Sequence, residues 1–165
     1  MKTRAANSTR KKVMIRTLEG EAVRGFLNPA HLGQTDPLDV LTPDGEHLSL
    51  ELKTLKSICF VNDFTDDFEP VRKAFLSRPK LDGLWVRLRF RDGDTLEGIV
   101  PNNLLELLDR GVQIIPPDLH GPTGRIFIPR TALAEMSVLG VVGIARRRAP
   151  RVADIEAAQP RLFGE

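Results

Sequence analysis

The stretch "RFRDGDTLEGIVPN", Arg89 to Asn102, has the pattern of a β-hairpin. Apolar and polar residues alternate on both sides of Asp92-Gly93, which is the period of a half-buried strand. Glycine at the turn supplies the positive φ that a tight hairpin requires. A further glycine, Gly98, stands inside the returning strand, where glycine is typical of a bulge or a sharp bend. The stretch therefore predicts a curved two-stranded unit.

The same hairpin occurs earlier in the chain as "RTLEGEAVRGFLNP", Arg16 to Pro29. The two copies align without a gap, with Gly20 on Gly93 and Gly25 on Gly98. After a shift of five residues, "HLSLELKTLKSICFV" also aligns with "RIFIPRTALAEMSVL", and each reads as a strand, a one-turn connector and a strand. Because an internal repeat marks a repeated structural unit, the chain is predicted to contain this unit twice.

Each copy combines five short strand patterns, a bend in the second strand and a one-turn connector before the last. These features predict a mainly β protein with two tandem five-stranded small barrels, at residues 13–64 and 84–145. Between them, residues 65–83 are predicted to form a short linker helix, because apolar residues recur there at helical spacing. These apolar residues are Phe64, Phe68, Val71 and Phe75. Burying a phenylalanine contributes roughly 1.5–3 kcal/mol, so we expect this helix to pack on a barrel or between the two.

Charge is distributed unevenly along the chain. Residues 1–12 hold five basic residues and no acid, and residues 146–165 hold five arginines against three acids. The formal net charge is only +2, so the body between the two termini is mildly acidic. Both basic termini lack a packing face and are predicted to be disordered tails.

The sequence favours a cytoplasmic protein with no membrane partner. The basic N-terminus is not followed by an apolar stretch, which argues against a secretory signal. No apolar run approaches the roughly 18 residues of a membrane span. The single cysteine, Cys59, excludes an internal disulfide, and its place in the apolar run "SICFV" predicts a buried hydrophobe rather than a reactive thiol.

Residue types that carry catalysis are sparse and scattered. His31, His47 and His120 lack the spacing of metal ligands, and no phosphate-binding loop, nucleophile elbow or zinc-peptidase motif is found. The acidic cluster in "NDFTDDF" can be a calcium ligand set or a helix cap, and its aromatic spacing favours the cap. We therefore expect no enzymatic activity, no metal site and no cofactor.

The stretch Val86 to Val100 is similar to the first motif of Sm-like proteins, and Gly124 to Arg130 resembles their second motif. The strand and turn pattern is shared with SH3-like barrels. Both halves also resemble an uncharacterised bacterial family of small barrels that end in Phe-Val-x-Asp-Phe, here Phe60 to Phe64. The Sm-like resemblance implies an RNA pocket built from two loops. In the second copy these loops contain Asn102, Asn103 and Arg125.

A leucine-rich segment, Pro101 to Pro117, offers a second candidate surface. Its apolar residues fall at both odd and even positions of the predicted strand, so they cannot all face one core. Leu104 and Leu107 are the candidates for contact with a partner, and packing within or between the barrels is the alternative. Small barrels also expose strand edges and grooves that can take peptides. The leading hypothesis is a non-catalytic binding or adaptor module that recognises a protein segment at an edge strand or in the cleft between barrels, or that self-associates.

The alternative hypothesis is a nucleic-acid binder whose basic tails contact phosphates. The residues concerned are Arg10, Lys11, Lys12, Arg146, Arg147 and Arg148. Salt separates the two hypotheses, because phosphate contacts lose affinity steeply as salt rises, whereas an apolar peptide groove responds little. A ligand-sensing barrel is a third possibility, for which no pocket residues are recognised in the sequence.

Overall fold

The computed structural model describes residues 9–107, 109–118 and 121–143, and within them the protein is mainly β. The elements are β1 (Lys11–Thr17), β2 (Ala22–Leu27), η1 (Pro29–His31), β3 (Leu38–Leu41), β4 (His47–Leu50), η2 (Leu52–Thr54), β5 (Leu55–Val61), β6 (Gly83–Phe90), β7 (Thr95–Val100), α1 (Leu104–Leu107), β8 (Gly111–Ile114), β9 (Thr123–Pro129), η3 (Arg130–Ala132) and β10 (Leu133–Val142). Apart from residues 9–12, the predicted basic tails lie outside the described residues.

The described strands form two open antiparallel sheets. One has seven strands in the order β4-β3-β2-β1-β5-β9-β8, and the other has three in the order β10-β6-β7. An isolated bridge between Ile99 and Ile115 connects β7 to the segment after β8. The predicted pair of separate five-stranded barrels is not confirmed, because β5 of the first half pairs with β9 of the second within one sheet.

Both halves of the chain nevertheless contain five strands in the same order, with a 3-10 turn before the last. β2 and β7, and likewise β3 and β8, are equal in length and have the spacing found in the sequence. The 3-10 turns η2 and η3 repeat at the longer spacing, and each leads directly into a last strand, β5 or β10. The turn glycines Gly20 and Gly93 have φ of 96° and 89°, as expected for the two hairpins. The repeat is therefore a repeat of structure as well as of sequence.

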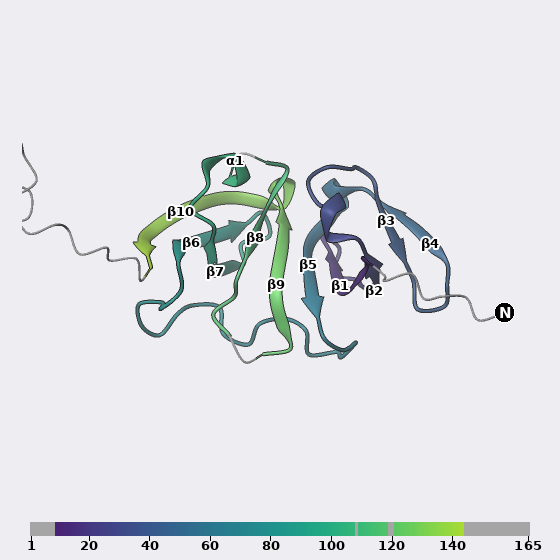
Figure 1. The fold of residues 1–165 in the computed structure, drawn as a ribbon, viewed down its shortest axis with the longest axis horizontal. Coiled ribbons are helices and arrows are strands. Elements are labelled where there is room, and N and C mark those ends of the chain that lie inside the picture. The colour runs from purple at the N-terminus through teal and green to yellow at the C-terminus, as the bar shows by residue number, and fades with distance from the viewer. Residues whose placement is uncertain (1–8, 108, 119–120, 144–165) are drawn as a thin grey trace, which may run out of the picture.

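The β5–β9 pairing, here called the seam, joins the two halves at the centre of the molecule (Figure 1). Ile58 pairs with Phe127, and Cys59 pairs with Ile126. Successive side chains of a strand point to opposite faces, so the seam serves a core on each side.

The first-half core contains Val13, Ile15, Leu27, Leu32, Leu38, Val40, Leu52, Leu55, Ile58 and Phe127. The second-half core contains Met14, Cys59, Val61, Phe68, Leu84, Val86, Leu88, Phe90, Leu96, Val100, Val112, Ile114, Ile126, Ile128 and Ala132. Phe127 thus comes from the second half but packs in the first-half core, while Met14 and Cys59 make the opposite exchange. The two halves form one packed unit through these exchanged side chains.

The segment between β5 and β6, here called the strap (residues 62–82), is irregular, and the predicted linker helix is wrong. Pro70 and Pro79 leave only eight residues between them, too few for a helix to be stable without tertiary support. Val71 is 85% exposed rather than part of an apolar stripe. Phe68 is buried in the second-half core, as predicted for the phenylalanines, and its carbonyl accepts a hydrogen bond from the Thr123 hydroxyl.

Candidate functional site

The strand β10 has a free edge. It pairs with β6 on one side, and no strand within the described residues pairs with its other side. Three apolar side chains near its end are open to solvent, with exposed fractions of 55% for Val138, 36% for Leu139 and 61% for Val141. A long edge strand with exposed apolar side chains is a template for pairing with another extended segment. This edge is the first candidate site.

A hollow of about 190 Å³ lies beside the first part of β10. It is lined by Leu107, Val112, Arg130, Leu133, Ala134, Glu135 and Met136. Leu107, Leu133 and Met136 are partly buried and pack against the second-half core. The hollow therefore has an apolar floor next to a strand edge, a combination that suits a side chain carried by an extended segment.

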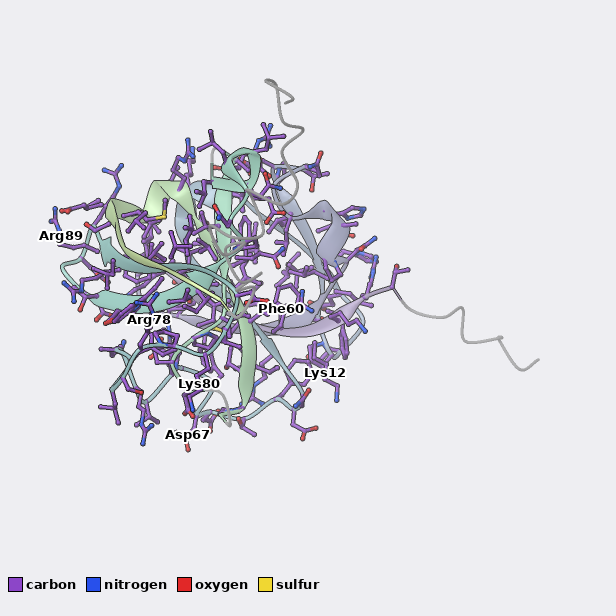
Figure 2. All side chains as sticks on the ribbon, turned by 60° about the vertical axis from the view of Figure 1, so that its left-hand side comes forward. Lys12, Phe60, Asp67, Arg78, Lys80 and Arg89 are labelled. Carbon is purple, nitrogen blue, oxygen red and sulfur yellow. The ribbon has the colours of Figure 1, made fainter. Side chains whose placement is uncertain are left out.

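Three arginines lie near β10, Arg78 on the strap and Arg87 and Arg89 on β6. Arg78 Nη2 donates to the Val141 carbonyl at 2.8 Å, so the strap contacts the end of the strand (Figure 2). Arg89 forms an ion pair with Glu135 at 2.9 Å, and this hydrogen bond lowers the pKa of the Glu135 carboxyl. Arg87 pairs in register with Ser137, is exposed, and forms no ion pair with any described residue. On its other side Arg87 stands opposite Glu97 of β7, which accepts a hydrogen bond from Trp85 and forms no ion pair with a described residue.

Two further hollows lie between the halves. The larger, about 660 Å³, is lined by apolar residues such as Ile99 and by three acids, Asp82, Glu106 and Asp109. The smaller, about 420 Å³, is here called the seam hollow. It is lined by Lys11, Lys12, Pro29, Phe60, Val61, Asn62, Gln113, Gly121, Gly124 and Arg125. Arg125 lines both hollows, so it separates an acidic region from a basic one.

The five residues predicted to bind a partner do not form one site. Asn102 and Leu104 are exposed in and beside α1. Asn103 caps this helix, because its Oδ1 accepts from the Leu105 amide at 3.1 Å and its Nδ2 donates to Glu106 Oε1 at 3.3 Å.

The remaining two predicted residues lie in separate hollows. Leu107 lines the hollow beside β10, whereas Arg125 lies on β9 at the seam. The loop pocket implied by the Sm-like resemblance would need Arg125 next to Asn102 and Asn103. None of the three hollows described above is lined by these residues together.

The cations of the alternative hypothesis differ in their contacts. Arg10 is paired with Asp39 at 3.5 Å, and Lys12 with Asp63 at 3.8 Å. Lys11 is exposed and, like Arg125, forms no ion pair with a described residue. The sequence did not predict that one hollow would be lined by Lys11, Lys12 and Arg125. The pairing of β5 with β9 brings these residues together, and that pairing joins strands that are far apart in the sequence. Arg146, Arg147 and Arg148 lie outside the described residues.

A charged cluster joins the strap to the second hairpin. Lys56 Nζ donates to Asp92 at 2.6 Å and to Asp94 at 3.2 Å, and Lys73 donates to Asp94 at 3.1 Å. Burial opposes the charge of Lys56, but the two hydrogen-bonded carboxylates raise its pKa. Its ammonium also lies 4.9 Å from the centre of the Phe90 ring, a cation–π contact. Since these charged groups pair with one another, the cluster has a structural role: it holds the strap and β5 against the second hairpin.

The sole cysteine is a core residue. Burial raises the pKa of the Cys59 thiol to about 12, which keeps it protonated and unreactive at neutral pH. Within the described residues no group of three or more His, Cys, Asp or Glu side chains is placed to hold a metal ion. No helix in the described part of the chain is long and apolar enough to cross a membrane.

These features define a mainly β protein of two repeated halves with an open apolar edge. Residues 9–140 match a family of unknown function, DUF6982, and the chain belongs to that family. The match extends over both halves, in agreement with the predicted membership of an uncharacterised family. No curated protein and no solved structure matches the chain.

Proposed function

We propose that this protein is a non-catalytic binding module that takes up an extended segment of a partner protein at the free edge of β10. The observation that carries the proposal is the ten-residue edge strand with Val138, Leu139 and Val141 open to solvent. A partner segment would add a strand beside β10, so backbone hydrogen bonds supply affinity and alternate side chains supply specificity. The five strands of each half, with a one-turn connector before the last, support assignment to the Sm-like or SH3-like type of small barrel. The single cysteine supports a place in the cytoplasm.

A peptide display selection against the full chain tests this function. Enriched peptides are synthesised and measured against Val138→Arg, which places a charge on the edge, and Val71→Arg, the same change on the strap. Both side chains are exposed, so both variants keep the fold. We expect Val138→Arg to weaken binding by about tenfold or more and Val71→Arg to leave it unchanged. Peptides that bind Val138→Arg as tightly as the unmodified chain refute the proposed site.

The seam hollow supports a second candidate function, the binding of a nucleic-acid backbone. Lys11, Lys12 and Arg125 line this hollow from both sides of the seam (Figure 2 labels Lys12). Two of the three cations have no ion-pair partner among the described residues and are available to phosphates.

The salt dependence of binding tests this second candidate. Affinity for a labelled single-stranded RNA is measured over a range of salt concentrations by fluorescence anisotropy. Lys11→Ala and Arg125→Ala should each reduce the slope of log K against log salt by about 1. Lys80→Ala removes an exposed cation of the strap and serves as the control (Figure 2). Equal slopes and affinities for all three variants exclude the seam hollow as a phosphate site.

A further inference from the structure

We propose that the segment bound at β10 carries an aromatic residue whose ring enters the hollow beside Met136. This residue is preceded by an acidic residue that pairs with Arg87. The inference rests on the function proposed above and names the chemistry of its partner. It follows from comparing the two halves, because the first half contains a filled version of the same site.

In the first half, the filled site lies beside β5. β9 pairs antiparallel with this strand and places Phe127 opposite Ile58. Phe127 is only 3% exposed and packs in the first-half core with Leu52 and Leu55. One aromatic side chain on an added strand therefore completes this half.

In the second half, the equivalent place is open. The repeat aligns η2 and β5 with η3 and β10 in the order of elements and in the spacing of the sequence. The positions equivalent to Leu52, Leu55 and Ile58 are Arg130, Leu133 and Met136. All three line the hollow of about 190 Å³ beside β10. The hollow thus lies where Phe127 lies in the first half, which makes an aromatic ring the natural occupant.

A second copy of this chain is a poorer occupant than a different protein. If β4 of another copy took the place that β9 takes in the seam, Ser49 would stand where Phe127 stands. On the other face of the new seam, Arg87 and Ser137 would replace Met14 and Cys59, two core residues. Burying an arginine in the place of a core methionine is costly without a partner charge. The free edges of β4 and β10 therefore do not fit each other as β5 and β9 do.

The register of the bound segment follows by analogy from the pairing of β9 with β5. An antiparallel segment with its aromatic residue opposite Met136 places the preceding residue opposite Ser137. That residue points to the other face of the sheet, beside Arg87 on β6, which is exposed and without an ion pair among the described residues. An acidic side chain there gains a charge-assisted contact. The residue before it lies opposite Val138 and is expected to be apolar. The expected order is apolar, acidic, aromatic.

Labelled peptides measured against the full chain by fluorescence anisotropy test this order. The probe is TGVEFIP, which is the β9 sequence TGRIFIP with valine and glutamate at its third and fourth positions. TGVEAIP lacks the ring, and TGVKFIP reverses the charge. We expect the probe to bind about tenfold or more tightly than either control. Arg87→Gln removes the charge without placing a second carboxylate opposite Glu97, and it should abolish the preference for glutamate over lysine.

The outcomes separate this inference from the proposed function. Equal binding of TGVEFIP and TGVEAIP, or a charge preference unchanged in Arg87→Gln, overturns the inference. The proposed function stands if display-selected peptides still depend on Val138. If no peptide depends on Val138, both fail. Dimers seen in sedimentation equilibrium and lost in Val138→Arg make a second copy the occupant and also overturn the inference.

The chain's own C-terminal sequence is a further alternative occupant. Residues 161–163 read Arg-Leu-Phe, close to Arg-Ile-Phe at residues 125–127. Phe163→Ala in the full chain therefore belongs in the same measurement. If this variant binds TGVEFIP more tightly than the unmodified chain does, the C-terminal segment competes for the hollow and the occupant is not a partner protein. Equal affinities support the proposal.

Discussion

Replacing Phe127 by alanine should destabilise both halves of the protein together. Phe127 belongs by sequence to the second half, yet its ring is buried in the first-half core. The ring also lies against the backbone position of Gly111, where a β-carbon would clash with it. The substitution therefore empties the space that the ring fills between the first-half core and Gly111.

The size of the effect follows from burial. Removing a buried phenylalanine side chain costs about 3–5 kcal/mol, because both the transfer energy and the contacts around the cavity are lost. Small domains are stable by about 5–15 kcal/mol, so Phe127→Ala should remain folded but become much less stable. With a urea dependence of about 2 kcal/mol per molar, the midpoint of unfolding should fall by roughly 2 M.

Urea unfolding followed by two probes measures this effect. Trp85, the only tryptophan, reports on the second half, where its Nε1 donates to Glu97 at 3.0 Å and its ring meets Phe75 edge-on. Far-ultraviolet circular dichroism reports on all strands. Because the seam exchanges side chains between the cores, both probes should shift to lower urea by the same amount.

The control for this experiment is Val141→Ala, which removes an apolar side chain that is already exposed. Its effect should stay within about 0.5 kcal/mol. A loss below about 1 kcal/mol for Phe127→Ala would show that the ring is not an anchor of the first-half core. A Trp85 transition that stays in place while the dichroism transition moves would show that the halves unfold independently. Either result refutes the exchange of side chains as the basis of a single unit.

Three further predictions concern charge, thiol and packing. Burial opposes ionisation of Asp94, but its lysine partners lower its folded pKa below the unfolded value of about 3.9. Its contribution to stability is therefore present above about pH 4 and lost as pH falls through the folded pKa, and Asp94→Asn should flatten this part of a stability–pH curve. Cys59 should react with a thiol reagent at pH 8 only after urea unfolds the protein, because burial raises its pKa to about 12. Gly25→Ala should cost about 1–3 kcal/mol in urea unfolding, since a β-carbon there lies 3.0 Å from the Leu41 carbonyl oxygen.

Each of these predictions has a result that contradicts it. Asp67→Asn, a change to an exposed acid without an ion pair among the described residues, should keep the acid dependence of the unmodified chain (Figure 2). If Asp94→Asn keeps it as well, the pairing of Asp94 with its lysines contributes nothing. A native thiol that reacts at the rate of the unfolded one would place Cys59 at the surface. An unchanged midpoint for Gly25→Ala would mean that β2 and β3 can separate freely.

The repeated elements could be predicted from the sequence because the signals for them are local. Alternation of polar and apolar residues identifies a strand, and an acidic residue followed by glycine identifies a tight turn, without reference to distant parts of the chain. The hairpins around Gly20 and Gly93 are formed as expected. The strap was mispredicted because phenylalanines at helical spacing can also be buried one at a time. Phe68 enters the core while Val71, three residues later, remains in solvent.

The joining of the two halves could not be predicted, because it depends on a pairing between distant strands. The sequence did contain one relevant signal. Ile58 and Cys59 in β5, and Ile126 and Phe127 in β9, are consecutive apolar residues, and a strand without alternation is typical of burial on both faces. The barrel hypothesis assigned only one face of each strand to a core, and so it left the second face of β5 unexplained. The seam explains it.

The same reasoning bears on the candidate site. β10 ends in the sequence "VLGVV", which, like β5, lacks alternation and has apolar side chains on both faces. β5 has β9 beside it, whereas the equivalent edge of β10 has no strand among the described residues. If the exposed valines were the only feature of the β10 edge, β4 of another copy would be expected to pair with it, and copies would add head to tail. Arg87 and Ser49 stand where the seam has Met14 and Phe127, and these polar residues oppose that assembly while leaving the edge open to a segment that can satisfy the arginine.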